Sequence, residues 1–161
     1  MVKGFSHTQI LLHWAVALLI VFNLVFNDAM SALWEQIEHT GPTPTTIGAW
    51  AHIIAGGAVL ALVAWRLALR FTRGVPHAPA GTNTWLKRGG DLGHIALYAL
   101  MIALPVTGLM AFFGGFDTLG ELHAEFLKSL LWALIVLHVV AALYHHFILK
   151  DGLLNRMRKP S

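Results

Sequence analysis

The chain has no cysteine and few charged residues. The absence of cysteine from all 161 residues excludes disulfides, thiolate metal ligands, iron–sulfur clusters and a cysteine nucleophile. Only 12% of the residues are charged whereas 57% are hydrophobic, a balance too apolar for an ordinary soluble domain. The composition therefore predicts a protein of the lipid bilayer, in which any metal chemistry would use imidazole.

Four apolar stretches are long enough to cross a membrane as helices. They cover residues 9–26, 46–65, 92–116 and 129–149. Each is close to the ~20 residues with which an α-helix crosses a hydrocarbon core of ~30 Å. The first lacks a small-residue cleavage site, so we expect a retained helix and not a signal peptide. With no internal repeat or long linker, the sequence predicts an all-α membrane protein whose residues 1–161 form one four-helix transmembrane bundle.

Basic residues predict the orientation of the bundle. Ten of the eleven Lys and Arg residues lie in the two tails and in the connection between spans two and three, whereas the other two loops hold only Lys128. The positive-inside rule then places both termini in the cytoplasm, and this use of the positive charge leaves no reason to expect a nucleic-acid partner. The outer loops are acidic, with Asp28, Glu35, Glu38, Asp117, Glu121 and Glu125. Residues 30–38 of the first outer loop are amphipathic and could form a short helix along the membrane interface.

Six histidines lie within the apolar stretches or at their ends: His13, His52, His94, His123, His138 and His145. Ionisable side chains at membrane depth are costly and usually mark functional sites. Helix rise places His13 and His138 at compatible depths in the inner half, and His52 and His123 near the outer face. Two imidazole pairs on facing helices of a bundle are what two b-type haems need as axial ligands.

Other interpretations of these residues remain. Each histidine could instead be a core residue hydrogen-bonded to a backbone carbonyl. Zinc would favour tightly clustered ligands, and a zinc or ion transporter would need carboxylates at mid-membrane, yet no Asp or Glu lies within the spans. Gly56 and Gly108 would admit a flat macrocycle or serve helix packing. Arg66 and Arg70 would pair with haem propionates or only set the topology.

Short motifs surround the histidines in all four spans. They are His13-Trp14, Trp50-Ala51-His52 with Gly56, Gly93-His94 to Tyr98, Ala103-Leu104-Pro105 to Gly108, Leu137-His138, and His145-His146-Phe147 with Lys150-Asp151. Together they resemble the bacterial cytochrome b561 family of small di-haem membrane proteins, over nearly the whole chain. By that resemblance, His13 and His138 would ligate an inner haem b. His52 and His123 would ligate an outer one, and His94 and His145 would contact a quinone.

The resemblance also implies a location and a reaction. In the branch that the chain resembles most, a protein of the bacterial inner membrane oxidises superoxide to O₂ at the outer face and passes electrons to ubiquinone near the cytoplasm. His94 and His145 fit this by position, because both lie near the inner ends of their spans. The acidic outer loops favour an alternative, a non-catalytic cytochrome b subunit docked to a soluble periplasmic dehydrogenase or carrier.

One spacing departs from the family. The interval from His123 to His138 is fifteen residues, one longer than the family spacing. The fourth helix must therefore absorb an extra residue, as a π-bulge or within an irregular start.

Overall fold

The computed structural model describes residues 4–77 and 82–160, which are almost entirely helical. The described residues form four long helices: α1 (His7–Val25), α3 (Ile47–Arg73), α4 (Thr84–Gly114) and a continuous helix over Asp117–Leu149. The last comprises α5 (Asp117–Glu121), η1 (Leu122–Leu127), α6 (Lys128–Tyr144) and η2 (His145–Leu149). A shorter helix α2 (Asp28–Thr40) follows α1, and a 3-10 turn η3 (Leu154–Met157) follows η2.

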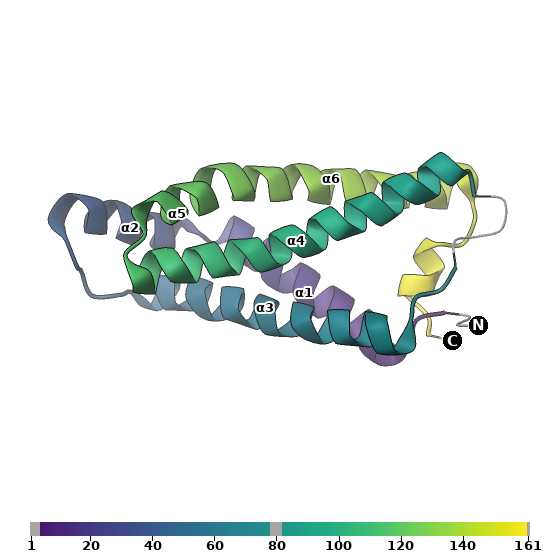
Figure 1. Ribbon diagram of the computed structural model, residues 1–161, viewed down its shortest axis with the longest axis horizontal. Coiled ribbons are helices and arrows are strands. Elements are labelled where there is room, and N and C mark those ends of the chain that lie inside the picture. Colours follow the sequence, from purple (N-terminus) through teal and green to yellow (C-terminus); the bar gives the residue numbers. More distant parts are fainter. Residues whose placement is uncertain (1–3, 78–81, 161) are drawn as a thin grey trace.

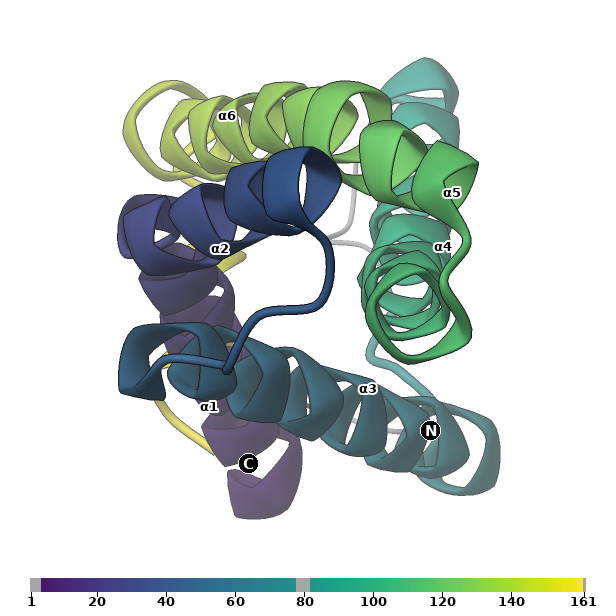
Figure 2. The same cartoon turned by 90° about the vertical axis from the view of Figure 1, so that its left-hand side faces the viewer.

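The long helices lie around a common axis (Figure 1, Figure 2). Helix α1 packs on α3, α3 on α4, and α4 on α6. Both chain ends lie at one end of the bundle, here called the terminal end, and α2 lies at the other, the α2 end (Figure 1). The predicted all-α membrane bundle is thus confirmed, with four helices long and apolar enough to span a bilayer among the described residues.

Side-chain caps determine where the long helices begin. Ser6 accepts a hydrogen bond from the Gln9 N–H, and the Gln9 side chain accepts one from the Ser6 N–H. Thr46 caps α3 by accepting from the Ala49 N–H. Such caps satisfy N–H groups that have no partner within the helix, and each stabilises it by about 1 kcal/mol.

The helices continue beyond the apolar stretches at the terminal end. Helix α3 continues to Arg73 and α4 begins at Thr84, so basic residues of this connection sit on helical turns. Lys3, which also contributes to the predicted orientation, lies outside the described residues.

The buried core is small and apolar. Val16 of α1, Val63 of α3 and Met101 of α4 meet in one cluster, with Val16 1% exposed and Val63 fully buried. Among the described residues no polar or charged side chain is completely buried. Large apolar side chains such as Leu18 and Phe71 instead face outward. This is the arrangement of a bundle held by helix packing in a surrounding of lipid.

The fourth long helix contains π-helical turns in two places within its described length. Segment η1 includes His123 near the start of the helix, and η2 begins at His145 near its end. A π turn accommodates one extra residue within an α-helix and is frequent at functional sites. The fifteen-residue interval left two possibilities open, a π-bulge or an irregular start of the helix, and η1 is π-helical.

Helix α2 packs closely against α5 and α3 at two glycines, Gly120 and Gly48. A Cβ atom at Gly120 would lie 2.5 Å from Cζ2 of Trp34, so the indole ring rests directly on the α5 backbone. The Trp34 Nε1–H donates to Glu38 Oε1 at 2.6 Å, which holds the ring in place. A Cβ at Gly48 would lie 2.6 Å from the Cβ of Ala29, so the start of α2 is equally close to α3. The short helix predicted within residues 30–38 is present and is part of the bundle.

Gly120→Ala should loosen α2, because the added methyl group overlaps the Trp34 ring and overpacking of this kind costs about 1–3 kcal/mol. We expect endoproteinase Glu-C to cleave after Glu35 and Glu38 faster than in the wild type, measured on detergent-purified protein. Gly57→Ala is the matched control, since a Cβ there meets nothing within 4 Å. Equal cleavage rates in the two variants would show that the Trp34 contact does not hold α2.

Candidate functional site

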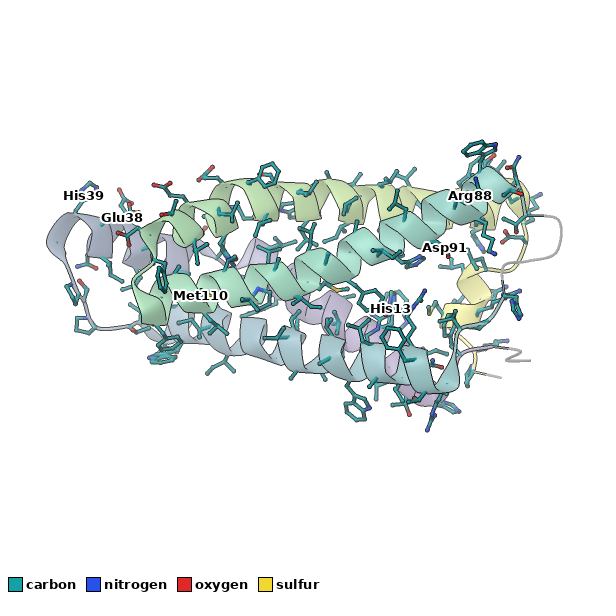
Figure 3. The ribbon with its side chains drawn as sticks, in the orientation of Figure 1. His13, Glu38, His39, Arg88, Asp91 and Met110 are labelled. Carbon is teal, nitrogen blue, oxygen red and sulfur yellow. The ribbon has the colours of Figure 1, made fainter. Side chains whose placement is uncertain are left out.

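Two histidine pairs lie between helices of the described bundle. His13 of α1 and His138 of α6 have ring centres 6.2 Å apart and ring planes at 53°. His52 of α3 and His123 of η1 have ring centres 6.2 Å apart and planes at 74°. All four side chains are half-buried, and His13 lies in the half of the bundle that holds the termini (Figure 3). The structure thus brings together the same pairs that helix depth predicted.

The separation within each pair suits one metal ion shared by two imidazoles. A metal–imidazole bond is about 2.0 Å long and each ring centre lies roughly 1 Å behind its nitrogen, so two opposed ligands have ring centres roughly 6 Å apart. In the described residues no hydrogen bond joins His13 to His138 or His52 to His123. Each pair can therefore bind one ion from two sides.

Helix α4 holds the His123 ring in a defined orientation. The His123 Nδ1–H donates to the carbonyl oxygen of Leu104 at 2.8 Å. Because a carbonyl only accepts, Nδ1 carries the proton and Nε2 keeps its lone pair, as a metal-ligating histidine requires. A Cβ at Gly108 would lie 3.0 Å from Cε1 of His123, so the glycine makes room for the ring. The backbone of α4 thus supplies both a hydrogen-bond acceptor and a cradle.

Asn23 lies beside the His52–His123 pair, and the sequence alone did not indicate this residue as part of the site. Its Nδ2–H donates to the carbonyl oxygen of His52 at 3.3 Å. The Asn23 Oδ1 and the His52 Nδ1 are buried and have no hydrogen-bond partner in the described part of the chain. A buried polar atom without a partner costs about 1–3 kcal/mol, which points to a bound group. The available signal was a polar side chain in an otherwise apolar span.

A cavity of about 320 Å³ lies beside the His52–His123 pair and extends to α2. Its walls include both histidines, Gly56, Gly108, Trp34, Lys128 and the carboxylates Glu35, Glu38 and Glu125. The volume lies in the range of small-molecule and cofactor sites, about 300–1,000 Å³. Lys128 is half-buried and has no acidic group within ion-pair distance among the described residues. The cavity therefore combines two imidazoles with one cation that has no ion-pair partner in the described chain, and with three carboxylates.

His94 lies against the first pair. Its ring centre is 5.5 Å from that of His138, with the planes at 80°, and its Nδ1–H donates to the Gly90 carbonyl oxygen at 2.6 Å. Unlike the rings of that pair, the His94 side chain is exposed. Arg66 lies within electrostatic range of His13 and His138, with its guanidinium 5.7 Å from the centre of the Tyr98 ring.

His145 is bonded to an acidic residue. Its Nδ1–H donates to Asp151 Oδ2 at 2.5 Å. Partial desolvation raises the pKa of Asp151, but the hydrogen bonds from the His145 side chain and the Leu153 N–H outweigh it and hold that pKa below its ordinary value. No hydrogen bond or ring contact joins His145 to His94 in the described structure. The two residues predicted to contact a quinone therefore lie in separate surroundings.

The donor set limits the metal chemistry. Within residues 4–77 and 82–160, no three His, Asp or Glu side chains are placed to hold one metal ion together. Structural zinc needs four protein ligands and catalytic zinc three. A pair of imidazoles instead suits an iron whose other ligands come from a macrocycle.

Known proteins resemble the chain along its whole length. The model of the prokaryotic cytochrome b561 family matches residues 4–160. A cytochrome b562 from Cereibacter sphaeroides is 34% identical over 157 residues, covering 98% of this chain and 96% of the relative. Cytochrome b561 homolog 1 from Escherichia coli is 31% identical over 173 residues, covering 95% and 96%. A probable superoxide oxidase CybB from Yersinia pestis is 29% identical over 179 residues, covering 96% of each.

The family model spans the four long helices and includes every histidine of the two pairs. Membrane electron transfer and haem b binding are the properties of this family, and the paired imidazoles agree with them. The chain belongs to the prokaryotic cytochrome b561 family.

Proposed function

We propose that this chain is a di-haem membrane oxidoreductase that moves electrons from a donor at the α2 end to a quinone at the terminal end. The common 6.2 Å separation within two histidine pairs carries the proposal. His13 and His138 would hold one haem b, and His52 and His123 the other. Haem, when bound, supplies reversible one-electron chemistry, while the chain supplies ligands, shape and charge.

Local features support the fit of haem to these pairs. Gly108 leaves space against His123, and unpartnered Asn23 and His52 atoms face the same region. Haem also carries two propionates, which need cationic partners. Arg66 lies near the first pair and Lys128 lines the cavity of the second, and neither has an acidic partner within ion-pair distance in the described chain.

Superoxide is the donor that we propose at the α2 end. The relative from Yersinia pestis is named a probable superoxide oxidase. The cavity beside His52 and His123 reaches α2 and is lined by Lys128, a cation without an ion-pair partner in the described chain, which would hold a small anion next to the pair despite the carboxylates of Glu35, Glu38 and Glu125. Two superoxide ions would give two O₂ and two electrons, which with two protons convert one quinone to its quinol.

Ubiquinone is the acceptor that we propose at the terminal end. The exposed ring of His94 packs on that of His138, so a lipid-soluble molecule can reach it from outside the bundle. A histidine there can hydrogen-bond a quinone carbonyl. Basic residues such as Arg88 gather at this end (Figure 3), which we propose faces the cytoplasm from the bacterial inner membrane.

Acidic side chains at the α2 end favour a second candidate, an electron-transfer subunit docked to a basic periplasmic carrier or dehydrogenase. Glu35, Glu38, Asp117, Glu121 and Glu125 are all exposed, and Glu38 lies at the tip of this end (Figure 3). Complementary charge would speed the encounter with such a partner.

Alanine in place of any one of His13, His138, His52 or His123 should halve the haem content, because each removes one axial ligand from one pair. The wild type should bind two haem b per chain and each variant about one, measured by pyridine haemochrome absorbance against protein concentration. His146→Ala is the control, since His146 belongs to neither pair. A haem-free wild type that is fully folded would falsify the proposal.

Gly108→Ala should lower haem content at the His52–His123 pair only. The new methyl group would crowd the His123 ring and disturb its hydrogen bond with Leu104. Gly89→Ala is the control in the same helix, because a Cβ there meets nothing within 4 Å. Haem content equal in both variants would mean that the close contact at Gly108 is not needed for ligation.

Pulses of superoxide should reduce the haems and then added ubiquinone faster than superoxide dismutates, measured by stopped-flow absorbance. Lys128→Gln should slow the first step, because it removes the cation of the cavity. His94→Gln should slow only quinone reduction and keep both haems. If superoxide is inactive while a basic soluble donor reduces the haems at a rate that falls with salt, the second candidate is correct.

A further inference from the structure

Asp151 is held in one orientation against His145. Its Oδ2 accepts the His145 Nδ1–H, and its Oδ1 accepts the Leu153 N–H at 3.0 Å. The His145 and Asp151 side chains are only 14% and 15% exposed. Both carboxylate oxygens are thus engaged, and these hydrogen bonds hold the pKa of Asp151 below its ordinary value.

The backbone turns back on itself to make this contact. Helix α6 ends in the π segment η2, after which Lys150 has a φ of 51° and Gly152 a φ of 75°. A residue with a side chain rarely adopts such a positive φ, so the conformation of Lys150 indicates a turn imposed by its surroundings. These two residues flank Asp151 and direct it toward the last turn of the membrane helix.

The segment that carries Asp151 also reaches the first histidine pair. The Trp14 Nε1–H donates to the Met157 carbonyl oxygen at 3.0 Å, and the Trp14 ring centre lies 5.2 Å from that of His13. Arg156 donates to the His77 carbonyl oxygen at 2.6 Å, which ties the same segment to the first part of the connection after α3. Asp151 therefore belongs to a structured cap over the terminal end, where the proposed quinone reduction would occur.

The hydrogen bond determines which nitrogen of His145 can act on another molecule. A carboxylate accepts only, so Nδ1 carries a proton and points to Asp151. Nε2 has no hydrogen-bond partner in the described chain. The charged groups around the pair are Asp151 itself and Arg156, which lies within electrostatic range of it, and the Tyr144 ring centre is 6.4 Å from that of His145. Nε2 is thus the atom that can exchange a proton.

We propose that Asp151 is a positioning residue that directs Nε2 of His145 toward a bound quinone. The inference rests on the proposed quinone reduction, which consumes two electrons and two protons per quinol. In each transfer the Nε2–H bond breaks and an O–H bond forms at a quinone oxygen, as an electron from the donor side arrives. His145 then takes a new proton from water at the terminal end, beside the Asp151 carboxylate.

The test compares Asp151→Asn with the wild type, using purified protein with its haems. We expect unchanged haem content and unchanged haem reduction by superoxide. The kcat of quinone reduction should fall about tenfold with little change in KM, because general acid catalysis contributes to turnover more than to binding. Asp151→Glu should restore part of the rate.

Asp91→Asn is the matched control, because it removes the same charge at the same end (Figure 3) from an exposed residue without a hydrogen bond or ion pair in the described part. Quinone turnover unchanged in Asp151→Asn, with the same kcat and KM as the wild type, would overturn the inference alone. Loss of haem in that variant would also overturn it, since Asp151 would then hold the fold. A wild type that reduces its haems but never quinone would overturn the proposed acceptor as well.

Discussion

Imidazole rings inside an apolar bundle must find partners, because neither lipid nor packed aliphatic side chains can solvate them. Three of the histidines described above meet this constraint within the chain, whereas the buried Nδ1 of His52 does not. His123 bonds to a backbone carbonyl of α4, His94 bonds to one in its own helix, and His145 bonds to a carboxylate. In each case the partner takes Nδ1, which leaves Nε2 for a group that the chain itself does not provide. The helices thus hold three histidines whose Nε2 atoms are free to bind a ligand.

The two ends of the bundle are built for different tasks. At the α2 end a short helix lies across the cavity, fastened by contact between an indole ring and a glycine. At the terminal end the C-terminal segment folds back over α1 through Trp14. Each end is therefore covered by a short helical element with an aromatic anchor. The histidine pairs lie between these covers, within a core that has few other polar groups.

Helix periodicity and depth were enough to predict the four spans, the helix within residues 30–38 and the meeting of His13 with His138, because these depend on distances along single helices. The contact of His94 with His138 depends on how α4 is rotated against α6, which span positions do not specify. The sequence did not predict that Asn23 lies beside His52 or that Asp151 bonds to His145, for other reasons. Asn23 is recognised only from the buried Asn23 and His52 atoms that lack hydrogen-bond partners in the structure. Asp151 reaches His145 only because Lys150 adopts a left-handed conformation.

The π turn η1 has a consequence for the rest of the fourth helix. Each residue added to a regular helix would rotate all later side chains by about 100°. An uncompensated insertion after His123 would therefore have swung His138 and His145 away from the bundle interior together. By widening one turn locally, η1 keeps the phase of everything that follows it. The helix thus tolerates a change in length at one point while its remaining turns stay in register with their neighbours.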